Sequence, residues 1–174
     1  MTFVPQNNYS KHDLIDCANG DLFTKDGDGR LPSDEMLMFD EIKNIDDFGG
    51  AYEKGSIDAR LQIHPDLWFF KCHFKTDPVM PGCLGLDAMW QLLGFYLLWP
   101  GLPGVGRALG AENVKFFGQV LPSAKEVRYK VDIKRVINRG AILGLADGEM
   151  FVDDKKIYSA DKLKVGLFKD PSNF

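Results

Sequence analysis

An almost entirely apolar stretch in the middle of the chain constrains the fold more than any other feature. It runs over 18 residues from Gly82 to Trp99, GCLGLDAMWQLLGFYLLW, with Asp87 and Gln91 near its middle. This length is at the short end of the range for a membrane-spanning helix, and an acid would be costly in lipid. We therefore expect a helix that is buried inside protein and does not enter a membrane.

Segments with a strand-like pattern precede and follow this helix, and short turns separate them at 121–123, 138–140 and 153–154. Short turns join antiparallel strands, because parallel neighbours need a crossover of about a dozen residues or more. A helix that is apolar on nearly all sides must be covered on nearly all sides, so we expect an α+β fold whose sheet curls round it. The expected strands cover residues 36–45, 51–63, 67–74, 108–120, 126–138, 141–153 and 156–168.

Composition indicates one ordinary globular domain over residues 1–174, with 45% hydrophobic and 26% charged residues. A net charge of -4 and a pI near 5.4 disfavour general binding to nucleic acid. Three cysteines without CxxC spacing, Cys17, Cys72 and Cys83, form no disulfide framework, and the first 13 residues do not read as a signal peptide. We expect a cytoplasmic protein.

The N-terminal region predicts a short helix and then a loop. Ser10 is a suitable N-cap, Asp13 lies three residues on, and Gly20 is a suitable stop. Asp26 and Asp28 resemble the start of a calcium-binding loop, but the remaining ligands and the closing Glu are missing. We therefore interpret this acidic loop as a solvated turn.

The residues before the apolar helix could form part of an active site. His73 ends an expected strand, and Pro78 and Pro81 stiffen the loop that leads to Gly82. The first backbone N–H groups of a helix have no partner within it and carry the positive end of its dipole. Gly82 and Cys83 could therefore donate hydrogen bonds to a carbonyl or oxyanion.

Asp87 supplies an acid close to these groups. Gln91 follows one turn later on the same face of the helix and could hold the carboxyl group in one orientation. A buried acid needs a partner or a raised pKa, and Arg107, the first cation after the helix, is a candidate partner; the sequence leaves this pairing open.

A base, an oxyanion site and an acid within one short stretch match the requirements for an active site. An imidazole beside carbonyl-binding N–H groups is suited to removing a proton from the carbon next to a carbonyl. A carboxylic acid could protonate a departing hydroxyl group. The combination indicates dehydration of a 3-hydroxyacyl compound.

The run DPVMPGCLGLDAMWQL at residues 77–92 closely resembles the 3-hydroxydecanoyl-[acyl-carrier-protein] dehydratase/isomerase family of bacterial type II fatty acid synthesis. The likeness extends over almost the whole chain. Further matching segments are LWFFKCHF at 67–74, GRALG at 106–110, VKFFGQVLP at 114–122, GLADGE at 144–149 and LKVGLF at 163–168.

The resemblance implies a hotdog fold, in which an antiparallel sheet wraps around a long central helix, and a homodimer with active sites at the subunit interface. It implies that His73 is the catalytic base and that Asp87 of the other subunit is the second catalytic residue. The N–H of Gly82 would hold the thioester carbonyl. The other candidate substrate-binding residues are Val79, Cys83, Gln91 and Arg107.

The implied reaction is dehydration of a (3R)-3-hydroxyacyl group of about ten carbons on acyl carrier protein, followed by isomerisation of the trans-2 to the cis-3 alkene. No cofactor or metal is implied. An Asp at position 87, where non-isomerising relatives usually have Glu, indicates the bifunctional branch. Lys75 and Thr76 depart from the family pattern, so the loop after His73 and the substrate preference could differ.

Three alternatives remain open at this point. The protein could be a dehydratase without isomerase activity, or a hotdog protein that only binds acyl groups. It could also be a covalent thioesterase that uses Cys83 with His73, because a helix N-terminus lowers a thiol pKa; the simpler interpretation is that Cys83 packs under the substrate tunnel.

We expect no metal at Cys72 and His73, because neighbours on a strand point to opposite faces.

The most basic part of the chain predicts the docking site for the acidic carrier protein. Alternating cations on a strand are also typical of a solvated face, but an acidic partner could bind them in a salt-dependent way. The candidate docking residues are Arg128, Lys134, Arg135, Arg139 and Lys164.

Overall fold

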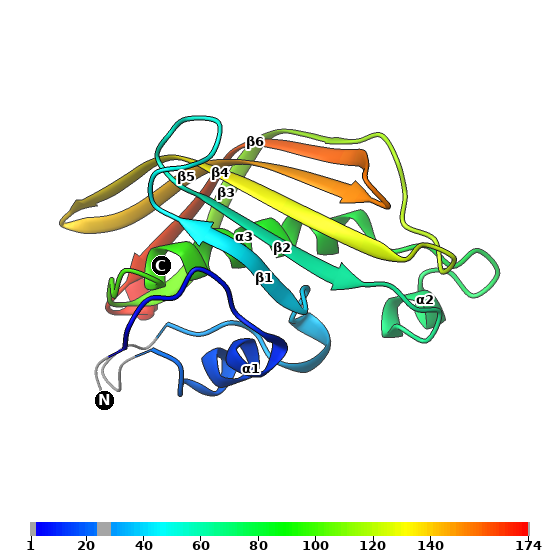
Figure 1. Cartoon of the computed structure of the whole chain (residues 1–174), viewed down its shortest axis with the longest axis horizontal. Coiled ribbons are helices and arrows are strands. Elements are labelled where there is room, and N and C mark those ends of the chain that lie inside the picture. The colour runs from blue at the N-terminus through cyan, green and yellow to red at the C-terminus, as the bar shows by residue number, and fades with distance from the viewer. Residues whose placement is uncertain (1–2, 24–28, 174) are drawn as a thin grey trace.

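The computed structural model describes residues 3–23 and 29–173, so Asp26 and Asp28 of the acidic loop lie outside the described residues (Figure 1). The helices are α1 (Lys11–Asn19), α2 (Trp68–Cys72) and α3 (Gly82–Leu98), with short 3-10 turns at Asp34–Met36 and Pro171–Asn173. The strands are β1 (Glu41–Asp46), β2 (Ser56–Gln62), β3 (Val105–Phe116), β4 (Glu126–Arg139), β5 (Ala141–Val152) and β6 (Lys155–Phe168).

The strands form one antiparallel sheet in the order β1-β2-β4-β5-β6-β3, and this sheet curves over α3 (Figure 1). Ten residues of α3 are buried, as its composition requires. The expected α+β hotdog fold is confirmed. No described helix is both long enough and apolar enough to cross a membrane.

The helix α3 packs closely on the sheet because glycine stands at the contact. A Cβ atom added at Gly85 would lie 2.5 Å from Sδ of Met150 and 2.6 Å from a ring carbon of Tyr158. Both neighbours are buried, on β5 and β6. Gly85 therefore sets how closely the first turns of α3 approach the sheet.

The two edges of the sheet differ. The edge of β1 is partly covered, since Tyr9 forms an antiparallel bridge with Ile42 and the N–H of Ile45 donates to the carbonyl of Asn7 at 2.9 Å. At the other edge, β3 pairs with β6 on one side, and no strand of the described residues pairs with its other side. That edge is open to another chain.

The expected helix at the N-terminus is confirmed, with a capping box between Ser10 and Asp13 and a left-handed Gly20 at its end. The expected strand at 67–74 is wrong, because Trp68–Cys72 form the helix α2. Its apolar residues Phe69 and Phe70 are buried from a helix, and a short apolar run does not distinguish the two structures by its pattern.

The strand boundaries also differ from those expected. β1 begins at Glu41, because a 3-10 turn ends at Met36 and residues 37–40 form no regular element. β2 begins at Ser56 because residues 49–55 form a turn, in which the N–H of Gly55 donates to the carbonyl of Gly49 at 2.9 Å. The remaining expected strands overlap β3, β4, β5 and β6.

The substitution Gly85→Ala tests the close packing. We expect overpacking to lower the free energy of unfolding by about 1–3 kcal/mol, measured by urea denaturation. Gly94→Ala is the matched control on the same helix, because a Cβ there meets only Cγ1 of Val165, at 3.9 Å. It should be neutral or stabilise by up to about 1 kcal/mol, as Ala favours a helix over Gly. Equal effects of the two substitutions would contradict the packing account.

Candidate active site

The imidazole of His73 is held in one orientation at the C-terminal end of α2. Its Nδ1 lies 2.9 Å from the carbonyl oxygen of Val79, which can only accept a hydrogen bond. Nδ1 therefore carries the proton in the neutral ring, and Nε2 has a lone pair that can accept one. The backbone supports this arrangement, because the N–H of Val79 donates to the carbonyl of His73 at 2.8 Å. The half-buried imidazole also contacts the ring of Phe74, at 4.0 Å between centroids.

The N-terminus of α3 presents backbone donors, as the sequence indicates. Pro81 is the N-cap, and the N–H of Leu84 donates to its carbonyl at 3.1 Å. Within the described part of the chain, the N–H groups of Gly82 and Cys83 have no backbone acceptor. Gly82 faces the ring of Phe116, which a Cβ atom there would approach to 3.5 Å. A carbonyl or oxyanion could accept hydrogen bonds from these N–H groups.

The carboxyl group of Asp87 is held by Gln91, one turn further along α3. Nε2 of Gln91 donates to Oδ2 of Asp87 at 2.6 Å and to the carbonyl of Met36 at 2.8 Å, and its Oε1 accepts from the N–H of Met38 at 3.3 Å. The carbonyl of Met36 can only accept and the N–H of Met38 can only donate. These two contacts therefore fix the Gln91 amide with Nε2 toward Asp87. Oδ1 of Asp87 makes no hydrogen bond within the described residues, so it remains available to a substrate.

The sequence signals the pair of Asp87 and Gln91 but not the role of residues 36–38. Their backbone groups act here, and any residue type provides such groups. The 3-10 turn that ends at Met36 places them against α3.

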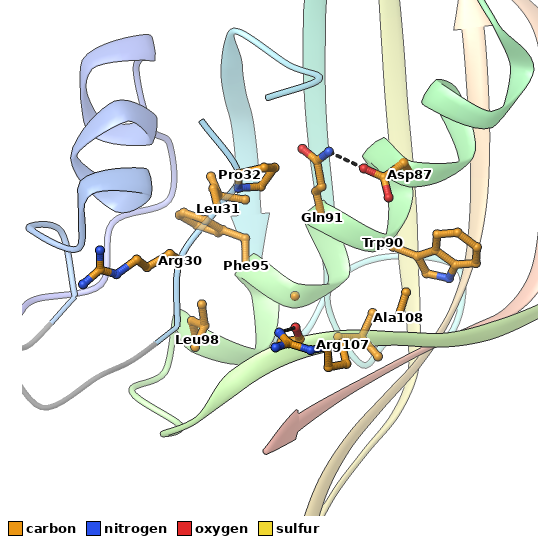
Figure 2. Close-up of a pocket in the computed structure, with 13 residues that line it drawn as sticks. Arg30, Leu31, Pro32, Asp87, Trp90, Gln91, Phe95, Leu98, Arg107 and Ala108 are labelled. Atoms are coloured by element: carbon orange, nitrogen blue, oxygen red, sulfur yellow. Dashed lines mark hydrogen bonds between the residues drawn. The ribbon is translucent and has the colours of Figure 1, made fainter. Parts of the chain in front are cut away.

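A pocket of about 250 Å³ opens beside this pair, between α3, β3 and residues 30–32 (Figure 2). Its polar groups include Asp87 and Gln91 at one end, whereas Arg107 lies toward the end near Leu98 (Figure 2). The remaining lining residues are mostly apolar. They are Leu31, Pro32, Trp90, Gly94, Phe95, Gly106, Ala108 and Val165, together with Arg30.

Arg107 lines this pocket without forming an ion pair with Asp87 in the described structure. Its Nη1 donates instead to the carbonyl of Gly106 at 2.9 Å. Asp87 is half-buried, not fully buried as the sequence suggests, and Gln91 is the partner that holds its carboxyl group. The pairing with Arg107 that the sequence leaves open is not formed within the described residues.

One chain does not bring all the candidate residues into this pocket. Asp87, Gln91 and Arg107 line it, whereas His73, Val79, Gly82 and Cys83 do not. Within one chain, Asp87 therefore lines this pocket and His73 does not.

The three cysteines are free and differ in burial. Cys83 is exposed, so the expectation that it packs under a tunnel does not hold within one chain. Cys72 and His73 do not lie on a strand, so the reason for excluding a metal there is wrong; Sγ of Cys72 lies 3.6 Å from the carbonyl of Trp68. Burial raises the pKa of the Cys17 thiol to about 12. No three His, Cys, Asp or Glu side chains of the described residues are grouped to hold a metal.

The candidate docking residues divide into two groups. Arg128, Lys134 and Lys164 pair with carboxylates on the sheet, which agrees with a solvated face. These pairs are Arg128 with Asp58 at 3.5 Å, Lys134 with Asp147 at 2.9 Å and Lys164 with Glu112 at 3.5 Å.

Arg135 and Arg139 are the second group. Both are exposed near the end of β4, where the β4–β5 hairpin extends beyond the rest of the sheet (Figure 1). They line a pocket of about 290 Å³, and neither forms an ion pair with the described residues. These two guanidinium groups are therefore available to an acidic partner.

Comparison with known proteins identifies the family. Residues 31–161 match the model of the FabA-like domain. The dehydratase heterocomplex ApeI:P from Xenorhabdus doucetiae contains a chain with TM-score 0.62 and 14% identity, over 82% of this chain and 90% of that one. A hypothetical thioesterase from Streptococcus pneumoniae, solved with coenzyme A, has TM-score 0.52 and 10% identity, over 73% and 84% of the two chains. These structures share the fold, and the family match covers most of the sequence. The chain belongs to the FabA-like domain family.

Proposed function

We propose that the protein dehydrates (3R)-3-hydroxyacyl groups of about ten carbons on acyl carrier protein and isomerises the trans-2 product to the cis-3 alkene. The observation that carries this proposal is the hydrogen bond between Nδ1 of His73 and the carbonyl of Val79. It leaves Nε2 as a neutral base, which proton abstraction next to a thioester requires. Membership of the FabA-like family and the dehydratase among the structural neighbours support it.

In the dehydration step, Nε2 of His73 removes a proton from C2 of the substrate. The thioester carbonyl gains negative charge and is stabilised by the N–H of Gly82 at the positive end of α3. Asp87 donates a proton to the C3 hydroxyl group as the C3–O bond breaks, and water leaves. Gln91 occupies Oδ2 of Asp87, so we assign the transferred proton to Oδ1.

In the isomerisation step, the same imidazole moves a proton within the acyl chain. His73 removes a proton from C4 of the trans-2-enoyl group and returns one to C2, so the double bond moves to C3. The N–H of Gly82 stabilises the dienolate between the two transfers. The step needs only one base that reaches both carbons.

We propose a homodimer in which His73 of one subunit faces Asp87 of the other. Two observations support it. The base and the acid of one chain do not line a common pocket. The open edge strand β3 and the segment after it also carry exposed apolar side chains, which a second copy would bury. These side chains are Leu109, Phe116, Phe117 and Leu121.

The setting that fits this function is the cytoplasm, where an acyl carrier protein would deliver the substrate. Three free cysteines are compatible with a reducing compartment.

The substitution His73→Ala tests the proposed base. We expect the rate of both dehydration and isomerisation of 3-hydroxydecanoyl thioester to fall by at least about 100-fold, because the proton acceptor is lost. Products are followed by chromatography of the trans-2 and cis-3 isomers, and circular dichroism confirms folding. Cys83→Ala is the control and should keep dehydration. Thioester hydrolysis by the unmodified protein that Cys83→Ala abolishes would favour the covalent thioesterase. Near-normal turnover by His73→Ala would contradict the proposal, and trans-2 product alone from the unmodified protein would remove the isomerase activity.

The docking proposal is tested by replacing both Arg135 and Arg139 with Ala. We expect kcat/KM for the carrier-bound substrate to fall by about ten-fold or more at low salt, with little change for a small thioester that lacks the carrier. Arg128→Ala is the matched control, because Arg128 is paired with Asp58 and should contribute little. An equal loss with both substrates, or the larger loss in the control, would show that the carrier binds elsewhere.

A further inference from the structure

We propose that Gly94 sets the acyl-chain length that the protein accepts. Its missing side chain leaves room for the end of a medium-length acyl tail in the pocket beside Asp87. The inference depends on the proposed dehydratase function, since it requires the reacting carbons to lie near that acid.

The position of Gly94 on α3 places it in line with the acid. Asp87, Gln91, Gly94 and Leu98 are spaced by three or four residues, so they share one face of the helix, and all four line the pocket. With a rise of 1.5 Å per residue, Gly94 lies about 10 Å along the axis from Asp87 and Leu98 about 16 Å.

The surroundings of Gly94 leave space where a side chain would project. A Cβ atom there would meet only Cγ1 of Val165, at 3.9 Å, whereas at Gly85 on the same helix it would clash with two side chains. Val165 lines the same pocket, together with the apolar side chains of Leu31 and Phe95. Gly94 is therefore not required for close packing of α3, and its effect is to keep the pocket open.

The length of an acyl tail matches this distance. An extended alkyl chain advances about 1.25 Å per bond, because carbon–carbon bonds are about 1.5 Å long and meet at about 111°. With C3 beside Asp87, the seven bonds to C10 span about 9 Å, which brings the terminal methyl group close to Gly94. A chain of 14 carbons would extend about 14 Å, toward Leu98 and the guanidinium group of Arg107.

The test compares chain-length profiles of Gly94 variants. We would measure kcat/KM for carrier-free 3-hydroxyacyl thioesters of 6, 8, 10 and 12 carbons with the unmodified protein, Gly94→Ala and Gly94→Leu. For Gly94→Leu we expect the ratio of C10 to C6 turnover to fall by about ten-fold or more, since two or more methylene groups lose their site. Gly94→Ala should shift the ratio in the same direction by less.

The control is Ala51→Leu, which adds bulk at an exposed turn before β2 and should leave the profile unchanged. Circular dichroism and thermal unfolding show whether each variant folds, and Gly94→Ala provides the test if Gly94→Leu does not. An unchanged C10 to C6 ratio, or an equal loss at every length, would overturn the role of Gly94 while the dehydratase function stands. Absence of turnover by the unmodified protein at every length would overturn both.

Discussion

A half-buried carboxyl group loses part of its hydration, so a hydrogen-bond donor beside it both stabilises and orients it. In this protein Gln91 is that donor to Asp87, and the same amide bonds to the backbone of Met36 and Met38. One side chain thus joins the acid to the segment that leads into β1. The same contacts therefore hold residues 36–38 against α3 and set the orientation of the acid.

A second backbone contact orients the proposed base, His73. The carbonyl of Val79 fixes the proton on Nδ1 of His73, and Val79 belongs to the loop that ends at the N-terminus of α3. The base and the donors of Gly82 are therefore set by one short loop. Asp87 lines a pocket that His73 does not line, and the edge of β3 that no described strand pairs is where we propose that a second copy brings the two together.

The sequence predicts α3 to within one residue at its end, because the long, almost entirely apolar run begins and ends close to the helix itself. It also indicates the pairing of Asp87 with Gln91, from their spacing. It fails at 67–74, because a short apolar run fits either a strand or a helix. It could not reveal the contacts of Met36, Met38 and Val79, since backbone groups are common to every residue type. The ion pairs of Arg128 and Lys134 depend on strand register, which the spacing does not give.

We propose that each active site combines His73 of one subunit with Asp87 of another. To test this, His73→Ala and Asp87→Ala are unfolded and refolded together, and dehydration by the mixture is measured. The mixed dimer would contain one intact site, so activity should reappear, up to about a quarter of that of the unmodified protein when half of the dimers are mixed. Each variant refolded alone should stay inactive. A mixture that remains inactive, although mass spectrometry shows mixed dimers, would contradict the shared site.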